Sequence, residues 1–308
     1  MPRRFLLGAM VLGLGALLQS AEPEPHAEAA LRDILAARDG ILAARGPAPS
    51  AAEPVFLAVW DFDGTILHGD CSEGLVENDR PVYAGLAQLC IERGLSSVYR
   101  PEGGVAEFWK DYRYLDERVG HWLAYPFIPQ ILRGAGAAEV RTLAREHFTA
   151  VLRRFYYASS LHMLRGLEAA GVHNLIISAS ADVFVDAAAS TLNLPEERFH
   201  GIALRIDVAG RLTSDVLPPL TWAEGKRAKL LELIAAYEDA YPKSDVIVLA
   251  AFGNSYGTDG AFLEHVARQP LPSGQRSVVL MINGGAAPER YRELFREVEQ
   301  RAVVGSPD

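Results

Sequence analysis

Two aspartates, Asp61 and Asp63, stand one residue apart, directly after the apolar run 55–60 and before Gly64 and Thr65. Carboxylates held this close repel each other unless a cation lies near them. Their spacing therefore indicates a site for a metal ion, a phosphate group or both. For an isolated Asp-x-Asp pair the alternative is two solvated turn residues, so the assignment depends on partners elsewhere in the chain.

Further polar features follow in order along the chain. Ser178 ends the apolar run 175–177, and Lys226 lies near the start of a predicted helix. Asn254 and Asp259 come after another apolar run. In open parallel sheets, ligands bind outside the carboxyl ends of the strands, so we expect these side chains to gather with the aspartate pair.

The elements that must position these residues alternate between short apolar runs and helical patterns. Strands alternating with helices predict an α/β fold, namely a Rossmann-like parallel sheet covered by helices on both faces. The predicted strands are 55–60, 174–178, 245–252 and 277–282, with a hairpin formed by 201–206 and 211–214. The predicted helices are 27–45 (interrupted near Gly40), 161–170, 181–192, 223–241, 260–268 and 288–301.

A long stretch, 75–157, separates the first two strands; it has helical periodicity, many aromatic residues and no convincing strand. We interpret it as a separate helical cap. Its aromatic residues favour a cap core, and a cage for a quaternary ammonium group is the alternative; the candidates are Trp109, Tyr112, Trp122 and Tyr125. The predicted division is an N-terminal helix and linker at 22–52, a core at 53–68 and 158–308, and a cap at 69–157.

The ordered motifs resemble those of the haloacid dehalogenase (HAD) superfamily, whose members are mostly Mg²⁺-dependent phosphohydrolases. The Asp61-x-Asp63-Gly-Thr motif after an apolar strand is the most specific of them. The cap placement is similar to that in the phosphoserine phosphatase-like branch, and secreted phosphorylcholine phosphatases are similar in cap placement and in having a signal peptide. The resemblance covers about 55–282.

This resemblance implies a role for each residue of the motifs. Asp61 would attack phosphorus and form an aspartyl-phosphate, and Asp63 would act as general acid and then as general base. The phosphate-binding residues would be Thr65, Ser178 and Lys226.

The resemblance also implies a Mg²⁺ site. Its ligands would be the carboxylate of Asp61, the backbone carbonyl of Asp63 and a group from Asn254 or Asp259. The family commonly has Gly-Asp where this chain has Asn254. An amide oxygen binds Mg²⁺ without contributing charge, and Asp259 would bind the ion directly or through water. A catalytically degenerate phosphate-binding protein is the alternative that Asn254 favours.

Three residues near the motifs have open assignments. Ser180 is the alternative to Ser178 as the phosphate-binding hydroxyl, because it lies only two residues away. His68 and Asp70 follow the first motif closely; we interpret them as loop residues, with substrate contact as the alternative.

The predicted function is that of an exported, Mg²⁺-dependent phosphomonoesterase acting on a small phosphorylated metabolite through an aspartyl-phosphate. A folded protein could not enter a site that the cap closes, so we do not expect protein substrates. Phosphotransfer to an alcohol is an alternative, because only the acceptor differs from water. Asp63 argues against a dehalogenase, which does not need a second acid. Substrate identity and oligomeric state do not follow from the sequence.

The composition and the N-terminal residues limit the possible partners and the cellular location of the protein. A net charge of −9 gives no support for nucleic-acid binding. Residues 1–21 have the basic, apolar and small-residue order of a signal peptide. We therefore expect a periplasmic or secreted protein without stable membrane insertion once the peptide is cleaved; an uncleaved anchor is the alternative. Cys71 and Cys90 form a disulfide or, as we favour, two separately buried thiols.

Overall fold

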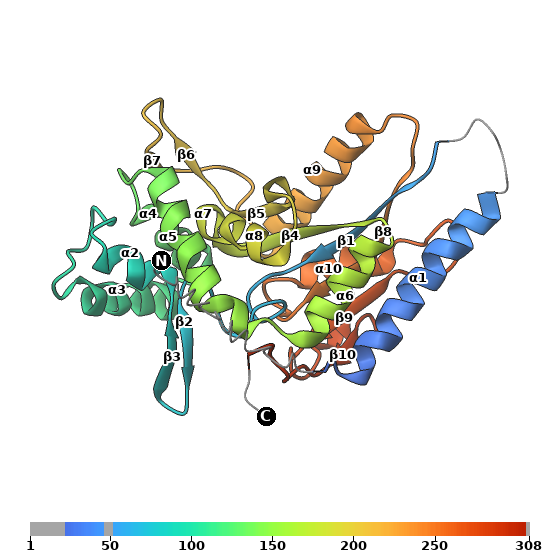
Figure 1. Ribbon diagram of the computed structural model, residues 1–308, viewed down its shortest axis with the longest axis horizontal. Helices are drawn as coiled ribbons and strands as arrows, with labels where there is room; N and C mark the ends of the chain where they lie inside the picture. The colour runs from blue at the N-terminus through green and yellow to red at the C-terminus, as the bar shows by residue number, and fades with distance from the viewer. Residues whose placement is uncertain (1–21, 46–51, 306–308) are drawn as a thin grey trace, which may run out of the picture.

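The computed structural model describes residues 22–45 and 52–305, and these are built around a six-stranded sheet (Figure 1). Its strand order is β10-β9-β8-β1-β4-β5, and each neighbouring pair is parallel. The α/β prediction is thereby confirmed. The strands are β1 (Val55–Trp60), β4 (Val172–Ala181), β5 (Phe199–Ile202), β8 (Val246–Gly253), β9 (Val278–Ile282) and β10 (Arg296–Val298).

Helices cover both faces of this sheet because its central strand, β1, is apolar on both sides. Ala58 and Trp60 of β1 belong to a buried cluster that includes residues of α1 (Pro25–Arg45) and α6 (Ala158–Ala169). Val59 points the other way, since side chains alternate along a strand. It joins a second cluster with residues of α9 (Glu224–Ala240) and α10 (Gly260–Arg268). The sheet is therefore the middle layer of three.

Trp60 fixes the end of β1 against its two neighbours. Its ring stacks on Phe252 of β8 with centroids 3.6 Å apart. Its indole Nε1 donates a hydrogen bond of 2.7 Å to Asn174 Oδ1 of β4. The backbone N–H of the next residue, Asp61, donates to the carbonyl of Phe252 at 2.8 Å. The first aspartate thus leaves the sheet at a well-fixed point.

The segment between β1 and β4 is mostly helical, but it begins with an antiparallel hairpin, so the prediction that it contains no strand is wrong. The hairpin, β2 (Gly74–Glu77) and β3 (Arg80–Ala84), projects from the body in Figure 1. Asn78 and Asp79 turn the chain with positive φ, which these residues tolerate. The strands carry little apolar alternation and contain a proline, which hides them from pattern reading. The helices that follow are α2 (Leu86–Glu92), α3 (Gly104–Arg118), α4 (His121–Gln130) and α5 (Ala137–Ala150).

The predicted C-terminal helix at 288–301 is also wrong. The structure has a short 3₁₀ turn, Glu289–Tyr291, followed by β10 at the edge of the sheet. Strand β10 pairs with β9 from Arg296 opposite Leu280 to Val298 opposite Ile282. Pairing with an exposed strand edge therefore outweighs the local helix propensity of this segment.

Two smaller expectations are corrected. Helix α1 continues through Gly40 without interruption, which costs only about 1 kcal/mol relative to alanine. The single helix predicted at 181–192 is three short pieces, α7 (Asp182–Val185), a 3₁₀ turn and α8 (Ala189–Leu192). The remaining predicted helices are confirmed. The predicted hairpin is β6 (Leu204–Ile206) with β7 (Leu212–Val216). Residues 201–202, predicted as part of its first strand, instead belong to β5 of the main sheet.

Cys71 and Cys90 are both buried free thiols, as favoured from the sequence. The predicted signal peptide, 1–21, lies outside the described residues. Within residues 22–45 and 52–305, none of the helices combines the length and the apolar character needed to cross a membrane.

Candidate active site

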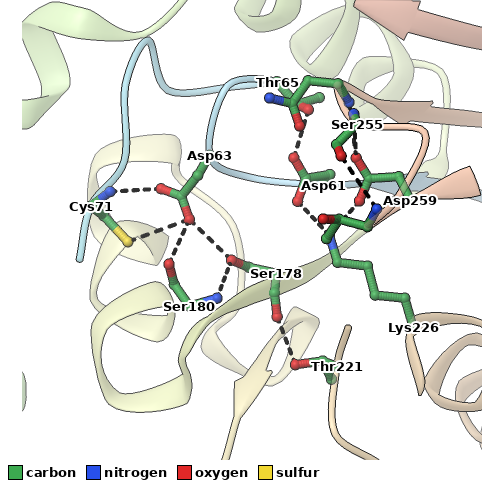
Figure 2. A network of polar contacts seen from close by, with 12 residues as sticks. Asp61, Asp63, Thr65, Cys71, Ser178, Ser180, Thr221, Lys226, Ser255 and Asp259 are labelled. Carbon is green, nitrogen blue, oxygen red and sulfur yellow. Dashed lines mark hydrogen bonds and ion pairs between the residues drawn. The ribbon is translucent and has the colours of Figure 1, made fainter. Parts of the chain in front are cut away.

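Three predicted residues from distant parts of the chain meet at the carboxyl edge of the sheet (Figure 2). Lys226, in the first turn of α9, places Nζ 2.5 Å from Asp61 Oδ1 and 2.7 Å from Asp259 Oδ1. Its side chain is 0% exposed. Burial alone would lower the pKa of Lys226, but the two carboxylates outweigh burial and raise it. The lysine is therefore a permanent cation between two acids.

Asp61 is held on both oxygens. Thr65 donates its hydroxyl to Asp61 Oδ2 at 2.7 Å, while Lys226 holds Oδ1. Burial, followed by the charge of Asp259, raises the pKa of Asp61 above its usual range, and Lys226 opposes this rise. The structure thus orients one carboxylate with a cation on one oxygen and a hydroxyl on the other.

The carboxylate of Asp63 turns toward a separate set of donors. Ser180 donates to its Oδ2 at 2.7 Å and Ser178 at 3.1 Å, while the backbone N–H of Cys71 donates to Oδ1 at 2.7 Å. Burial, with the nearby charge of Asp70, raises the pKa of Asp63 to about 7. A carboxyl group with that pKa can carry a proton near neutral pH, as a general acid must.

The two serines differ in their access to the cavity beside Asp61 and Asp63. Ser178 is fully buried, and its carbonyl accepts a hydrogen bond from Thr221 at 2.7 Å. Ser180 lines the cavity beside Asp61 and Asp63. Both are on the same face of β4, because residues two apart on a strand point the same way. Both hydroxyls therefore bond Asp63, and of the two serines only Ser180 also lines the cavity.

A cavity of about 150 Å³ opens beside these carboxylates. Its core side includes Asn254 and Thr258, and its other side includes Ser72 and Glu73, which follow the first motif, and Tyr125 of α4. A larger cavity of about 830 Å³ lies near the end of β10 and contains none of the predicted site residues. We assign the chemistry to the smaller cavity, where those residues converge.

The fourth motif divides its two polar residues between different tasks. Asp259 is fully buried, and its Oδ2 accepts the backbone N–H groups of Asn254 and Ser255 at 2.9 and 3.0 Å. Its other oxygen is bonded to Lys226. Asp259 thus shapes the loop, and Asn254 lines the cavity. Gly64 has a φ of +74°, and a Cβ there would lie 1.9 Å from Asn254 Nδ2, so a larger residue would strain the backbone and displace the Asn254 amide.

These positions fit a Mg²⁺ ion, which prefers oxygen ligands. Asp61 and Asn254 line the same cavity, and Asp63 follows on the same loop. Among the residues that the structure describes, the Asn254 side-chain amide has no hydrogen-bond partner. Both oxygens of Asp259 are engaged by the protein. Of the two candidates in the fourth motif, Asn254 is therefore the one positioned to bind the ion.

A second group of possible metal ligands lies nearby, and the sequence did not predict it as a group. Ligand atoms of Asp63, Asp70 and Cys71 lie within 4.8 Å of one another. Burial, followed by the charges of the two aspartates, raises the pKa of the Cys71 thiol, which keeps it protonated. A protonated thiol is a poor ligand for Mg²⁺, so this group is not the predicted centre. Asp63 belongs to the first motif, and the sequence signal for Asp70 was its position shortly after that motif.

The acids make the stability of the metal-free protein depend on pH. The folded pKa of Asp63 is raised to about 7 from an ordinary value of 3.8. Stability linked to this group is therefore present below pH 4 and is lost as pH rises through 7. The free energy of unfolding of the wild type should fall between pH 5 and 8. In Asp63→Asn this fall should be smaller by on the order of 1–3 kcal/mol. Urea denaturation in EDTA measures the unfolding free energy of both proteins. Saturating Mg²⁺ should reduce the difference between their pH dependences. Identical pH dependence of the two proteins in EDTA would contradict it.

Comparisons with solved structures agree with this fold. A protein of unknown function from Bordetella pertussis Tohama I has a similar structure, with 16% identity and a TM-score of 0.56 over 80% of this chain and 98% of that one. One of unknown function from Anaerococcus prevotii DSM 20548 has 16% identity and a TM-score of 0.52, over 87% and 88%. Cytosolic 5'-nucleotidase IIIB bound to cytidine has 15% identity and a TM-score of 0.51, over 82% and 78%. At these identities the likeness shows the fold alone.

Sequence comparison identifies the family. No curated protein matches the chain. The model of the family described as haloacid dehalogenase-like hydrolase matches residues 58–264, more than half of the 308 residues. This match confirms the resemblance found in the ordered motifs. The chain belongs to the haloacid dehalogenase-like hydrolase family.

Proposed function

We propose that the protein is a Mg²⁺-dependent phosphomonoesterase that acts on a small phosphorylated metabolite through an aspartyl-phosphate on Asp61. The observation that carries this is the setting of the Asp61 carboxylate, which lines the cavity while Lys226 and Thr65 each hold one of its oxygens. Family membership supports a hydrolase, and the name of the similar nucleotidase supports a phosphate ester as substrate.

The residues divide the reaction into two steps. Asp61 attacks phosphorus as the bond to the leaving oxygen breaks, and Asp63 gives that oxygen its proton. Asp63 then takes a proton from water as the water attacks the aspartyl-phosphate, which releases inorganic phosphate and restores Asp61. Bound Mg²⁺, held by Asp61, the Asp63 carbonyl and Asn254, would neutralise charge on the phosphoryl oxygens.

The cavity favours substrates smaller than a nucleotide. Its volume of about 150 Å³ lies below the roughly 300–1,000 Å³ of pockets for drug-sized ligands. Residues from the segment between β1 and β4 line it together with the core, which supports our proposal that 69–157 acts as a cap. Transfer of the phosphoryl group to an alcohol in place of water is the second candidate.

Purified protein lacking 1–21 tests the proposal with p-nitrophenyl phosphate. We expect turnover in Mg²⁺ and a loss of at least tenfold in EDTA, restored by added Mg²⁺. Absence of turnover at every pH tested, in protein shown to be folded, would overturn the proposed function. Adding glycerol and comparing released nitrophenol with released phosphate separates hydrolysis from transfer to an alcohol.

We also propose export to the periplasm or the medium, on the basis of residues 1–21. Cell fractionation and N-terminal sequencing of the exported protein test this. Retention of the full chain in the cytoplasm would contradict export, and a full-length chain in the membrane fraction would show an uncleaved anchor.

A further inference from the structure

One wall of the catalytic cavity is acidic beyond the needs of the reaction. Asp70 and Glu73 line it together with the two motif aspartates. None of the described residues that line the cavity is lysine, arginine or histidine. The cation closest to the nucleophile, Lys226, is already shared by Asp61 and Asp259. Asp70 and Glu73 therefore have no basic partner in this cavity.

This wall has a fixed shape. Asp70 Oδ1 accepts the backbone N–H groups of Ser72 and Glu73 at 2.7 and 2.8 Å. Tyr112 of α3 donates its hydroxyl to Glu73 Oε1. Among the described residues, the second oxygens of Asp70 and Glu73 receive no hydrogen bond. These contacts hold two carboxylates in place and leave one oxygen of each for a ligand.

Ser72 gives an independent indication of a ligand. Its side chain is 1% exposed, it lines the cavity, and its Oγ has no hydrogen-bond partner within the described part of the chain. A buried hydroxyl without a partner costs on the order of 1–3 kcal/mol. A group that brings N–H donors into the cavity would satisfy Ser72 and both carboxylates together.

We propose that this wall binds a primary ammonium group on the alcohol portion of the substrate, which makes the substrates small amino-alcohol phosphates. The proposal rests on the proposed function. The simplest such reaction converts 2-aminoethyl phosphate and water to 2-aminoethanol and inorganic phosphate. The ring of Tyr125 at the same cavity is compatible with a cation.

The same contacts exclude two related substrate types. A quaternary ammonium group has no N–H to donate, so the Ser72 hydroxyl would stay without a partner. A leaving group that also carries a carboxylate would place it among acids, with no basic side chain lining the cavity. Selectivity for a primary amine over both types is therefore the distinctive expectation.

Calorimetric binding in saturating Mg²⁺ tests this without relying on turnover. The probe is 3-aminopropylphosphonate, in which CH₂ replaces the ester oxygen, and the matched neutral probe is n-butylphosphonate. We expect the amine to bind about 10- to 100-fold more tightly, as one or two charge-assisted hydrogen bonds would give. The trimethylammonium analogue should lose most of this advantage. Glu73→Gln and Ser72→Ala should each reduce the ratio of the affinities for the amine and butyl probes. Glu117→Gln, on the exposed surface of α3, should leave this ratio unchanged.

The outcomes separate the two proposals. Equal affinity for the amine and butyl probes, in protein that hydrolyses p-nitrophenyl phosphate, overturns the amine site and leaves the phosphatase. Amine preference in protein that hydrolyses no phosphate monoester supports the site and overturns the phosphatase. If Glu73→Gln lowers the number of bound divalent ions and leaves amine preference intact, the wall binds a second metal and the proposal is wrong.

Discussion

Replacing Lys226 with methionine is expected to destabilise the protein by about 3–5 kcal/mol and to abolish turnover. The side chain is 0% exposed, and its Nζ bonds Asp61 and Asp259. Methionine has a similar length but removes the charge, which leaves two buried carboxylates without their cation. Asp61 would also lose the contact that orients one of its oxygens. Urea denaturation in EDTA and p-nitrophenyl phosphate turnover measure the two effects.

Lys229 gives a matched control on the same helix. Its Nζ lies 2.7 Å from Glu232, but that glutamate side chain is 56% exposed, and such surface pairs contribute about 0–1 kcal/mol. Lys229→Met should therefore resemble the wild type. Adding Asp259→Asn to Lys226→Met should recover part of the stability and none of the turnover. A Lys226→Met protein as stable as Lys229→Met would contradict the assigned role of this buried triad.

The sequence was sufficient to group the proposed site residues because each follows or opens a strongly marked element. Asp61 and Asn254 follow apolar runs that become neighbouring parallel strands, β1 and β8. Parallel strands end at the same edge, so placing the runs also places the side chains. The register of β1 with β8, from Val55 opposite Val246 to Trp60 opposite Phe252, then brings the two motifs together.

The features that the sequence missed or left open are those whose position depends on tertiary contacts. Strand β10 forms only because β9 offers it a free edge. The choice between Ser178 and Ser180 depended on how far β4 continues, and it continues to Ala181. The direction of the Asp70 side chain depends on hydrogen bonds from the backbone N–H groups of Ser72 and Glu73, which no spacing rule predicts. That of the Glu73 side chain depends on the Tyr112 hydroxyl of α3.

The aromatic residues of the proposed cap also have surroundings that the sequence did not predict. Tyr112 is buried and bonds Glu73, in the core of the proposed cap, whereas Trp122 is 55% exposed. Tyr125 lines the cavity, and Trp109 packs against Phe108. Their aromatic character alone puts all four in one group of candidates for a core or a cage. Their different surroundings support the core interpretation for Tyr112, and of these four residues only Tyr125 lines the cavity.

Asp61→Asn is expected to lower kcat by about 10⁴- to 10⁶-fold, the range seen when a catalytic nucleophile is removed. The amide has nearly the same shape, and its oxygen can still accept from Lys226, so the fold should be retained. Because burial raises the pKa of Asp61, a neutral amide should leave the metal-free protein as stable as the wild type or more stable. Steady-state turnover of p-nitrophenyl phosphate and urea denaturation measure these effects.

Acid trapping of a ³²P-labelled substrate isolates the role of Asp61 from that of Asp63. Wild-type protein should retain protein-bound phosphate on Asp61, and Asp61→Asn should retain none. Asp63→Asn should accumulate label, because p-nitrophenolate leaves without an added proton while attack by water still needs a base. Equal labelling of wild type and Asp61→Asn would place the covalent bond elsewhere. Rapid turnover by Asp61→Asn without any label would remove the aspartyl-phosphate from the mechanism, and the contacts from Lys226 and Thr65 would then only bind phosphate.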